Sequence, residues 1–249
     1  MAFIKRIPLA LSALALSLAA LGNLLAPYSP NVRLACGAAA AALVLLIAAR
    51  LAFDFEGVRA DLANPAMLAV TPAFPMALML LAAYMRPVAA APALVLWIAA
   101  LAFQLTLVAV FVRRHVLSFK LAQVLPSWFL VFVGFVVASV TSPAFSMQPV
   151  GRALLYAGGV GYVGILSVLI YRLVRVGGLP EPALPTLAIL AAPPSLVLVG
   201  YLAVAETKQA GVVYALLAVG AISLAYVLTR LPRILRLRFH PGFAALTFP

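Results

Sequence analysis

Charged residues divide this chain of 249 residues into eight long stretches that contain no Asp, Glu, Lys or Arg. The stretches are residues 7–32, 34–49, 62–85, 87–112, 121–151, 153–171, 182–205 and 209–229. All but the second reach the ~18 residues that a helix needs to cross a ~30 Å hydrocarbon core, and Arg33 and Arg50 can snorkel to extend the second. Strands of a membrane barrel would alternate in polarity, which these stretches do not. The pattern predicts an all-α polytopic membrane protein with eight spans.

The composition supports the same class of fold. Hydrophobic residues make up 67% of the chain and charged residues only 9%, with a mean hydropathy of +1.20. Soluble domains are usually about 25% charged and at most about half apolar. A water-soluble protein of this composition would expose far too much apolar surface, so the spans belong in a bilayer.

The basic residues predict an orientation. A net charge of +12 could indicate nucleic-acid binding, but the Lys and Arg residues lie where membrane topology requires them. With a cytoplasmic N-terminus, thirteen fall inside, and the four outside are Arg33, Arg86, Arg152 and Lys208. This distribution satisfies the positive-inside rule. We therefore expect a bacterial inner-membrane protein whose basic loops face anionic lipid headgroups, with no nucleic-acid partner.

The N-terminal segment has an alternative interpretation as a signal peptide, because Lys5 and Arg6 precede an apolar run that ends near Gly22. The apolar regions of signal peptides are normally shorter, about 7–15 residues. More membrane protein also follows, so a retained first span is favoured.

The loops alternate in character, which predicts one membrane domain over residues 1–249 built from helical hairpins. Loops on the predicted inside carry charge, as at 50–61 and 230–240, whereas outside loops such as 28–30 are short and nearly neutral. A ninth apolar segment, residues 241–249, is too short to cross a bilayer as a helix. We expect it to be the start of a ninth span in a C-terminally truncated chain.

Proline distinguishes odd-numbered from even-numbered segments. Prolines in or near the odd-numbered segments are Pro8, Pro72, Pro75, Pro126, Pro193, Pro194 and Pro249, whereas the even-numbered segments have none in their interiors. An interior proline removes a helical hydrogen bond, and the freed backbone needs neighbours or a wet cavity. We therefore expect kinked odd helices around a pore and straight even helices against lipid. The alternative is that prolines are simply commoner in membrane helices.

Small residues predict close helix packing in two places. One is the run of small residues from Cys36 to Ala42, and the other contains Gly158, Gly159, Gly161 and Gly164. Small side chains allow membrane helices to approach one another closely.

The sequence carries no hydrolytic, metal-binding or phosphate-binding motif. His115 and His240 lie in basic loops, Asp54, Glu56 and Asp61 fit a solvated ion-paired loop with Arg50 and Arg59, and the lone Cys36 excludes an internal disulfide. We expect no enzyme activity, cofactor or metal. The uncharged stretches also lack the buried ionisable residues that mark coupled carriers, which favours a passive pathway. Phe129, Phe132, Phe135 and Phe248 could form a hydrophobic constriction, although ordinary packing is the favoured explanation for each of them taken singly.

Four strings resemble the tellurite-resistance/dicarboxylate transporter family, which includes bacterial TehA, yeast malate permeases and plant slow anion channels. They are DFEGVRAD at 54–61 with Asn64-Pro65, LPSWF at 125–129 with Val133-Gly134, LAAPPS at 190–195 with Gly200-Tyr201-Leu202, and the region from Phe239 to Pro249. The strings follow the family's order along nearly the whole chain. The chain departs from the family at Val131 and Phe132, where relatives often have proline.

The resemblance implies ten helices in five hairpins with quasi-fivefold symmetry, odd helices lining one pore per protomer, and a homotrimer. It places the pore gate at Phe248 and helix kinks at Pro8, Pro72, Pro193 and, less securely, Pro126. Phe129, Phe132, Gly134 and Ser195 lie within the matching strings and are candidate pore-lining residues.

The expected function is a channel or facilitator for small inorganic anions, with selectivity from pore width and the positive ends of helix dipoles. The alternative within transport is a proton-coupled carrier of C4-dicarboxylates such as malate. A membrane-embedded enzyme and a non-transporting scaffold remain alternatives from other classes.

Overall fold

The computed structural model describes residues 2–238 and 241–247, and these residues are almost entirely helical, with no β-strand among them. The longer helices are α2 (Leu11–Leu25), α3 (Pro30–Phe53), α6 (Ala73–Met85), α7 (Ala90–Phe111), α10 (Gln148–Arg175), α11 (Ala192–Val204) and α12 (Ala210–Ile234). The shorter ones are α1 (Ala2–Lys5), α4 (Phe55–Asp61), α5 (Pro65–Val70), α8 (Trp128–Phe132) and α9 (Val136–Thr141). The prediction of an all-α fold is confirmed.

Tighter or wider helical turns complete several segments. The 3₁₀ turns are η2 (Leu121–Gln123), η3 (Ser142–Phe145), η4 (Glu181–Ala191) and η5 (Pro241–Leu246), and η1 (Val112–Val116) is a π-turn. The odd-numbered segments, from the first to the ninth, contain α2, α5–α6, α8–η3, η4–α11 and η5. The even-numbered segments, from the second to the eighth, contain α3, α7–η1, α10 and α12.

Six of these segments are helices long and apolar enough to cross a bilayer, namely Pro30–Phe53, Pro65–Met85, Ala90–Val116, Gln148–Arg175, Glu181–Val204 and Ala210–Ile234. The first and fifth segments contain shorter apolar helices, Leu11–Leu25 and Val136–Phe145. In the first segment, residues 6–10 form turns before α2 begins, and in the fifth segment residues 133–135 interrupt the helix. Each continuous helix is therefore shorter than its uncharged stretch.

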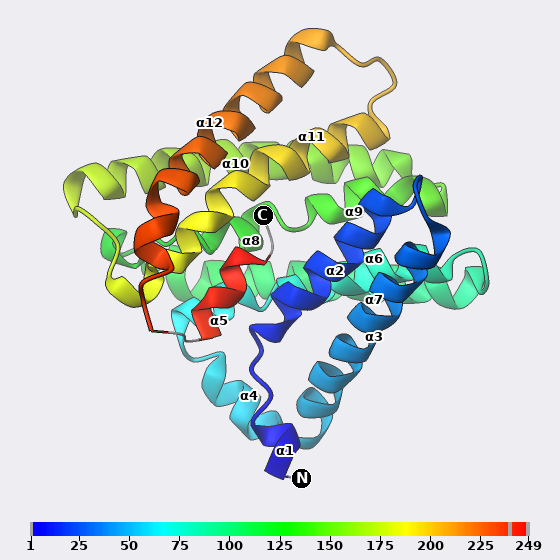
Figure 1. Cartoon of the computed structure of the whole chain (residues 1–249), viewed down its shortest axis with the longest axis horizontal. Helices are drawn as coiled ribbons and strands as arrows, with labels where there is room; N and C mark the ends of the chain where they lie inside the picture. Colours follow the sequence, from blue (N-terminus) through cyan, green and yellow to red (C-terminus); the bar gives the residue numbers. More distant parts are fainter. Residues whose placement is uncertain (1, 239–240, 248–249) are drawn as a thin grey trace.

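Burial separates the segments into an inner and an outer set. Of the 18 most apolar consecutive residues, 67% are buried in the third segment and 56% in the seventh. The corresponding share is 6–28% in the second, fourth, sixth and eighth segments. Most of α8 and α9 in the fifth segment is buried as well. In Figure 1, α3 and α12 lie along opposite edges of the molecule, with α2, α8 and α11 between them. The odd-numbered segments therefore form the core, and apolar side chains of the even-numbered segments face outward.

Most prolines of the odd-numbered segments lie at or near the starts of helical pieces. Pro8 lies in the link between α1 and α2, and Pro72 separates α5 from α6. Pro75, Pro193 and Pro194 stand in the first turns of α6 and α11, and Pro126 precedes α8. A first-turn proline lacks an N–H that would have no helical partner anyway, so it costs little there. The even-numbered set has one exception to the predicted alternation, because α12 extends past its apolar stretch and includes Pro232.

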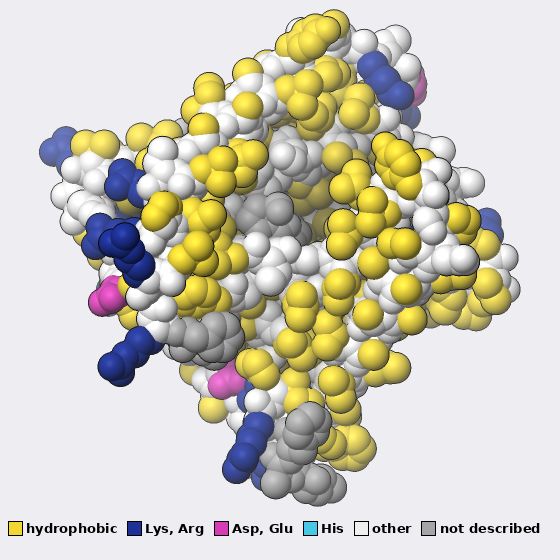
Figure 2. Space-filling model, in the orientation of Figure 1, with side chains coloured by type: hydrophobic (Ala, Val, Ile, Leu, Met, Phe, Trp, Pro, Cys, Tyr) yellow, Lys and Arg dark blue, Asp and Glu magenta, His cyan; other side chains and the backbone are white. Residues whose placement is uncertain are grey.

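Loops predicted on the same side of the membrane lie together. In Figure 1 the N-terminus and α4 lie at the lower end, whereas the loops joining α2 to α3, α6 to α7 and α11 to α12 lie on the right. Most Lys and Arg side chains visible in Figure 2 lie along the left and lower edges of the molecule. Each hairpin thus returns to one basic side, which we call the basic side below.

Close helix approaches occur at only some of the predicted glycines. A Cβ added at Gly161 of α10 would lie 2.6 Å from the carbonyl oxygen of Phe132, and one at Gly158 would collide with Val136. Gly159 and Gly164 have no neighbouring atom within 4 Å of such a Cβ. Gly158 and Gly161 therefore face the fifth segment, while the other two glycines of the run face outward.

Arg50 ties the first segment to the loop after α3. Its side chain is 7% exposed, donates to the backbone carbonyl of Ile7, and pairs with Asp61 at 2.7 Å and Asp54 at 3.6 Å. The prediction of a solvated ion-paired loop is wrong for Arg50, because packing of the first segment against the end of α3 buries the guanidinium.

Replacing Arg50 by methionine is expected to lower the free energy of unfolding by about 2 kcal/mol. Breaking a buried pair costs more than this in a dry site, but Asp61 is 36% exposed and can be rehydrated. Thermal unfolding in detergent measures the effect. Arg59→Met is the control, because Arg59 is exposed on α4 with no described ion pair; equal losses in both variants would contradict the role given to Arg50.

Candidate functional site

A cavity of about 280 Å³, which we call the central cavity, lies among the basic-side ends of the odd-numbered segments. Its walls contain Ala10 and Ala13 of the first segment; Ala66, Met67 and Val70 of the third; Leu125, Ser127 and Leu130 of the fifth; Pro180, Pro182, Ala183, Thr186 and Ile189 at the seventh; and Gly242, Ala244 and Ala245 of the ninth. All five odd-numbered segments contribute, and the even-numbered segments do not. This is the arrangement expected of inner helices around a shared pathway.

The chemistry of the central cavity is almost entirely apolar. No acidic, basic or histidine side chain is among its lining residues in the part of the chain that the structure describes. Its two hydroxyl groups differ: Thr186 donates to the Ala183 carbonyl at 2.6 Å, whereas the Ser127 Oγ has no hydrogen-bond partner. Ser127 is only 1% exposed. Ser127 is therefore a lining residue of the cavity whose buried hydroxyl has no hydrogen-bond partner.

A second, much smaller cavity of about 10 Å³ adjoins the central cavity, and we call it the narrow cavity. Its lining residues are Met76, Phe129, Leu130, Val133, Gly134, Ile189, Pro193 and Leu196, all from odd-numbered segments. Leu130 and Ile189 line both cavities, so the two spaces are neighbours. A volume of this size holds about one water molecule. The narrow cavity is thus a small apolar space beside the central cavity.

The third, fifth and seventh segments all interrupt their helices between the two cavities. Val70, Leu130 and Ile189 line the central cavity, and Met76, Gly134 and Pro193 line the narrow one. Between them, α5 gives way to α6, α8 to α9, and η4 to α11. At each of these breaks one helical piece ends where the next begins, and the first amides of α6 and α9 already donate to carbonyls of the preceding turn.

The interruption of the fifth segment occurs at Gly134 and involves no proline. Residues 133–135 form a turn, and the amide of Gly134 does not donate to the Leu130 carbonyl as it would in a continuous helix. Gln104 of α7, fully buried, instead donates its Nε2–H to that carbonyl at 3.4 Å. A Cβ on Gly134 would lie 2.7 Å from the Met76 sulfur and 3.0 Å from the Gln104 Nε2. Gln104 thus partners a carbonyl that the break would otherwise leave unpaired.

The structure brings together only part of the predicted site. Phe129, Gly134 and Pro193 line the narrow cavity. Phe132 packs against Phe111 and Trp128, with ring centroids 6.0 and 6.4 Å apart. Ser195 donates to the Ala191 carbonyl at 3.2 Å and lies near Gly220 of α12. Phe248 lies outside the described residues.

Sequence reasoning did not select Ser127, Thr186 or Gln104. Ser127 stood within the LPSWF string, and Gln104 is the only amide in the stretch 87–112. A polar residue inside a membrane segment needs a partner or a function, so Ser127 and Gln104 could have been selected from the sequence on that ground. Only the tertiary structure separates Ser127, whose hydroxyl is unused, from Thr186, whose hydroxyl bonds its own helix.

Together, the apolar segments define a multi-pass membrane protein whose odd-numbered segments enclose a shared cavity. A sequence profile of the family described as SLAC1, voltage-dependent anion channel, matches residues 6–249. The protein belongs to this family of anion channels and transporters, which confirms the resemblance drawn from the sequence motifs. No curated protein matches the chain.

Proposed function

We propose that this protein is a passive channel for small inorganic anions, and that anions pass from the central cavity through the narrow cavity. The observation that carries this proposal is the composition of the pathway. Its described walls contain no carboxylate to repel an anion, and Ser127 among them has a buried hydroxyl without a hydrogen-bond partner.

An anion that enters this pathway must lose part of its hydration shell, which is costly unless donors replace the water. The Ser127 hydroxyl supplies such an interaction. A fixed cationic side chain would bind an anion more tightly and slow its release. Neutral donors therefore suit conduction, in which binding must be weak enough for the ion to leave.

The alternative is a proton-coupled carrier of C4-dicarboxylates. The central cavity, at about 280 Å³, offers enough room for a solute larger than a single hydrated ion. Coupling to protons normally uses a buried group that gains and loses a proton. The absence of such a group among the described lining residues favours the passive channel.

Flux into proteoliposomes tests the proposal. Chloride or nitrate efflux, with valinomycin and K⁺ to balance charge, should occur at equal pH on both sides and should exceed that of protein-free liposomes. Malate uptake that requires an inward proton gradient, without chloride flux, would establish the carrier instead. Absence of both fluxes from correctly folded protein would leave an enzyme or scaffold.

The narrow cavity suggests how the channel closes. Phe129 and Met76 line this space, which has about the volume of one water molecule, and a dry apolar neck excludes ions. The gate that the family resemblance assigns to Phe248 stays a prediction, as does the homotrimer with one pore per protomer.

The proposed location is a bacterial inner membrane with the N-terminus and the basic side in the cytoplasm. Single cysteines introduced in a Cys36→Ser background test this orientation. A cysteine at the exposed position Arg175 should resist a membrane-impermeant thiol reagent in intact cells, whereas one at Lys208 should react. Labelling at Arg175 but not at Lys208 would reverse the orientation; both should react in permeabilised cells.

A further inference from the structure

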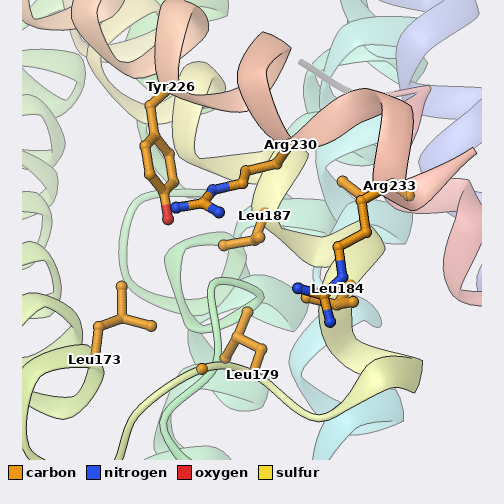
Figure 3. Close-up of a pocket in the computed structure, with 9 residues that line it drawn as sticks. Leu173, Leu179, Leu184, Leu187, Tyr226, Arg230 and Arg233 are labelled. Atoms are coloured by element: carbon orange, nitrogen blue, oxygen red, sulfur yellow. The ribbon is translucent and has the colours of Figure 1, made fainter.

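A separate pocket of about 180 Å³ lies on the basic side, between the C-terminal ends of α10 and α12 and the 3₁₀ helix η4. We call it the lateral pocket. Its interior presents leucines of three elements: Leu173 of α10, Leu179 of the following turn, and Leu184 and Leu187 of η4. Figure 3 shows Arg230 and Arg233 extending from α12 toward Leu187 and Leu184 of η4, with Leu173 and Leu179 on the other side of the pocket. The pocket thus combines an apolar floor with two cationic groups.

The two arginines have no acidic partner among the described residues, because the ion pairs of that part of the chain involve only Arg50 and Arg152. The Arg230 guanidinium instead lies 5.2 Å from the ring centroid of Tyr226, one turn earlier on α12. The cation–π contact orients the Arg230 side chain without neutralising its charge. Two neighbouring guanidinium groups with their charges uncompensated favour a ligand that carries a phosphate.

A buried arginine outside the lateral pocket, Arg172, holds the turn that forms part of the pocket floor. Arg172, 2% exposed, donates from its guanidinium to the carbonyl of Gly177 at 2.8 Å. Gly177 has a φ of 87°, a conformation that favours glycine. This bond fixes the turn that presents Gly178 and Leu179 to the pocket. The pocket therefore has its shape without a ligand.

We propose that the lateral pocket binds an anionic phospholipid, with the headgroup phosphate on Arg230 and Arg233 and the first part of an acyl chain against the leucines. Soluble phosphates offer the same charge but nothing to cover the apolar floor. The basic ends of membrane helices lie at the depth of lipid headgroups, and basic pockets between helices there suit anionic lipids. This inference concerns a site apart from the anion pathway and does not depend on conduction.

The same 3₁₀ helix separates the lateral pocket from the central cavity. Leu184 and Leu187 of η4 face the lateral pocket, whereas Ala183, Thr186 and Ile189 face the central cavity. Residues three apart lie on one side of a 3₁₀ helix, which explains the two faces. A lipid bound in the lateral pocket would lie directly behind the wall of the anion pathway.

Native mass spectrometry of the full chain in dodecyl maltoside tests the site, with dioleoyl phosphatidylglycerol and dioleoyl phosphatidylcholine as probes. The unaltered protein should bind the anionic lipid more tightly. The Arg230→Gln/Arg233→Gln variant should lose about 25-fold in affinity for phosphatidylglycerol, at about fivefold for each arginine. Arg230→Lys/Arg233→Lys, which keeps both charges, should retain most of the affinity.

Arg175→Gln is the matched control. Arg175 is exposed at the same end of α10, lies over the ring of Tyr171 at 5.5 Å, and does not line the lateral pocket. It should keep phosphatidylglycerol affinity within twofold. Equal losses in Arg175→Gln and the single variants Arg230→Gln and Arg233→Gln would attribute binding to surface charge, and an unaffected double variant would exclude the pocket. Glycerol phosphate binding as tightly as the lipid would overturn the assignment to a lipid.

Discussion

Gly161→Ala is expected to lower the free energy of unfolding in detergent by about 1–3 kcal/mol, which is the usual cost of adding a methyl group where no space exists. The added Cβ would lie 2.6 Å from the Phe132 carbonyl oxygen. That oxygen is part of the backbone and cannot rotate away as a side chain could. Relief requires α10 to move away from the fifth segment, whose residues line both cavities.

Gly164→Ala provides the control for this prediction. Gly164 lies less than one turn further along α10, and a Cβ there meets no atom within 4 Å. Both substitutions replace a helical glycine by alanine and gain the same helix propensity, up to about 1 kcal/mol. The difference between their melting temperatures therefore measures packing alone. Equal melting temperatures would show that α10 does not contact the fifth segment at Gly161.

Ser127→Ala is expected to reduce the apparent anion affinity of the channel about tenfold or more. A hydrogen bond to a charged group contributes about 1.5–3 kcal/mol, and the Ser127 hydroxyl is the one described side-chain donor of the central cavity without a partner of its own. The concentration dependence of chloride flux in proteoliposomes measures the effect. This prediction depends on the proposed anion pathway.

The matched control is Ser139→Ala. Ser139 also belongs to the fifth segment, is fully buried, and has an Oγ without a hydrogen-bond partner, but it lines neither cavity. Losing its hydroxyl should leave the anion affinity unchanged. Ser127→Thr keeps a hydroxyl and should recover part of the affinity, provided that its extra methyl group is accommodated. Equal effects of Ser127→Ala and Ser139→Ala would remove Ser127 from the pathway.

The division between inner and outer segments could be predicted because prolines are easy to see in a sequence. The role of each individual proline could not be predicted. Pro72 does separate two helices, but Pro75 and Pro193 occupy first turns, and the break at Gly134 involves no proline. The Leu130 carbonyl at that break accepts from Gln104, which lies 26 residues earlier on another helix. A contact of this kind leaves no local pattern.

The glycine run of α10 gives the same lesson for packing. Four glycines within seven residues predicted close approach, and two of them, Gly158 and Gly161, meet the fifth segment. The helical period of 3.6 residues turns Gly159 away from these two, but it places Gly164 as close in angle to Gly161 as Gly158 is. The spacing shows which glycines lie near one face, but only the packed structure shows which of them meets a neighbour.

The sequence alone determined the number of apolar segments, their helical form and which loops lie together on the basic side. Each of these follows from a requirement that the bilayer imposes residue by residue: length, absence of charge, and internally satisfied backbone. The tertiary structure alone decided which side chains meet. It buried Arg50, left the Ser127 hydroxyl without a hydrogen-bond partner and placed Arg230 and Arg233 beside leucines of η4. These outcomes depend on segments far apart in the chain, because a side chain's surroundings are set by the helices packed around it.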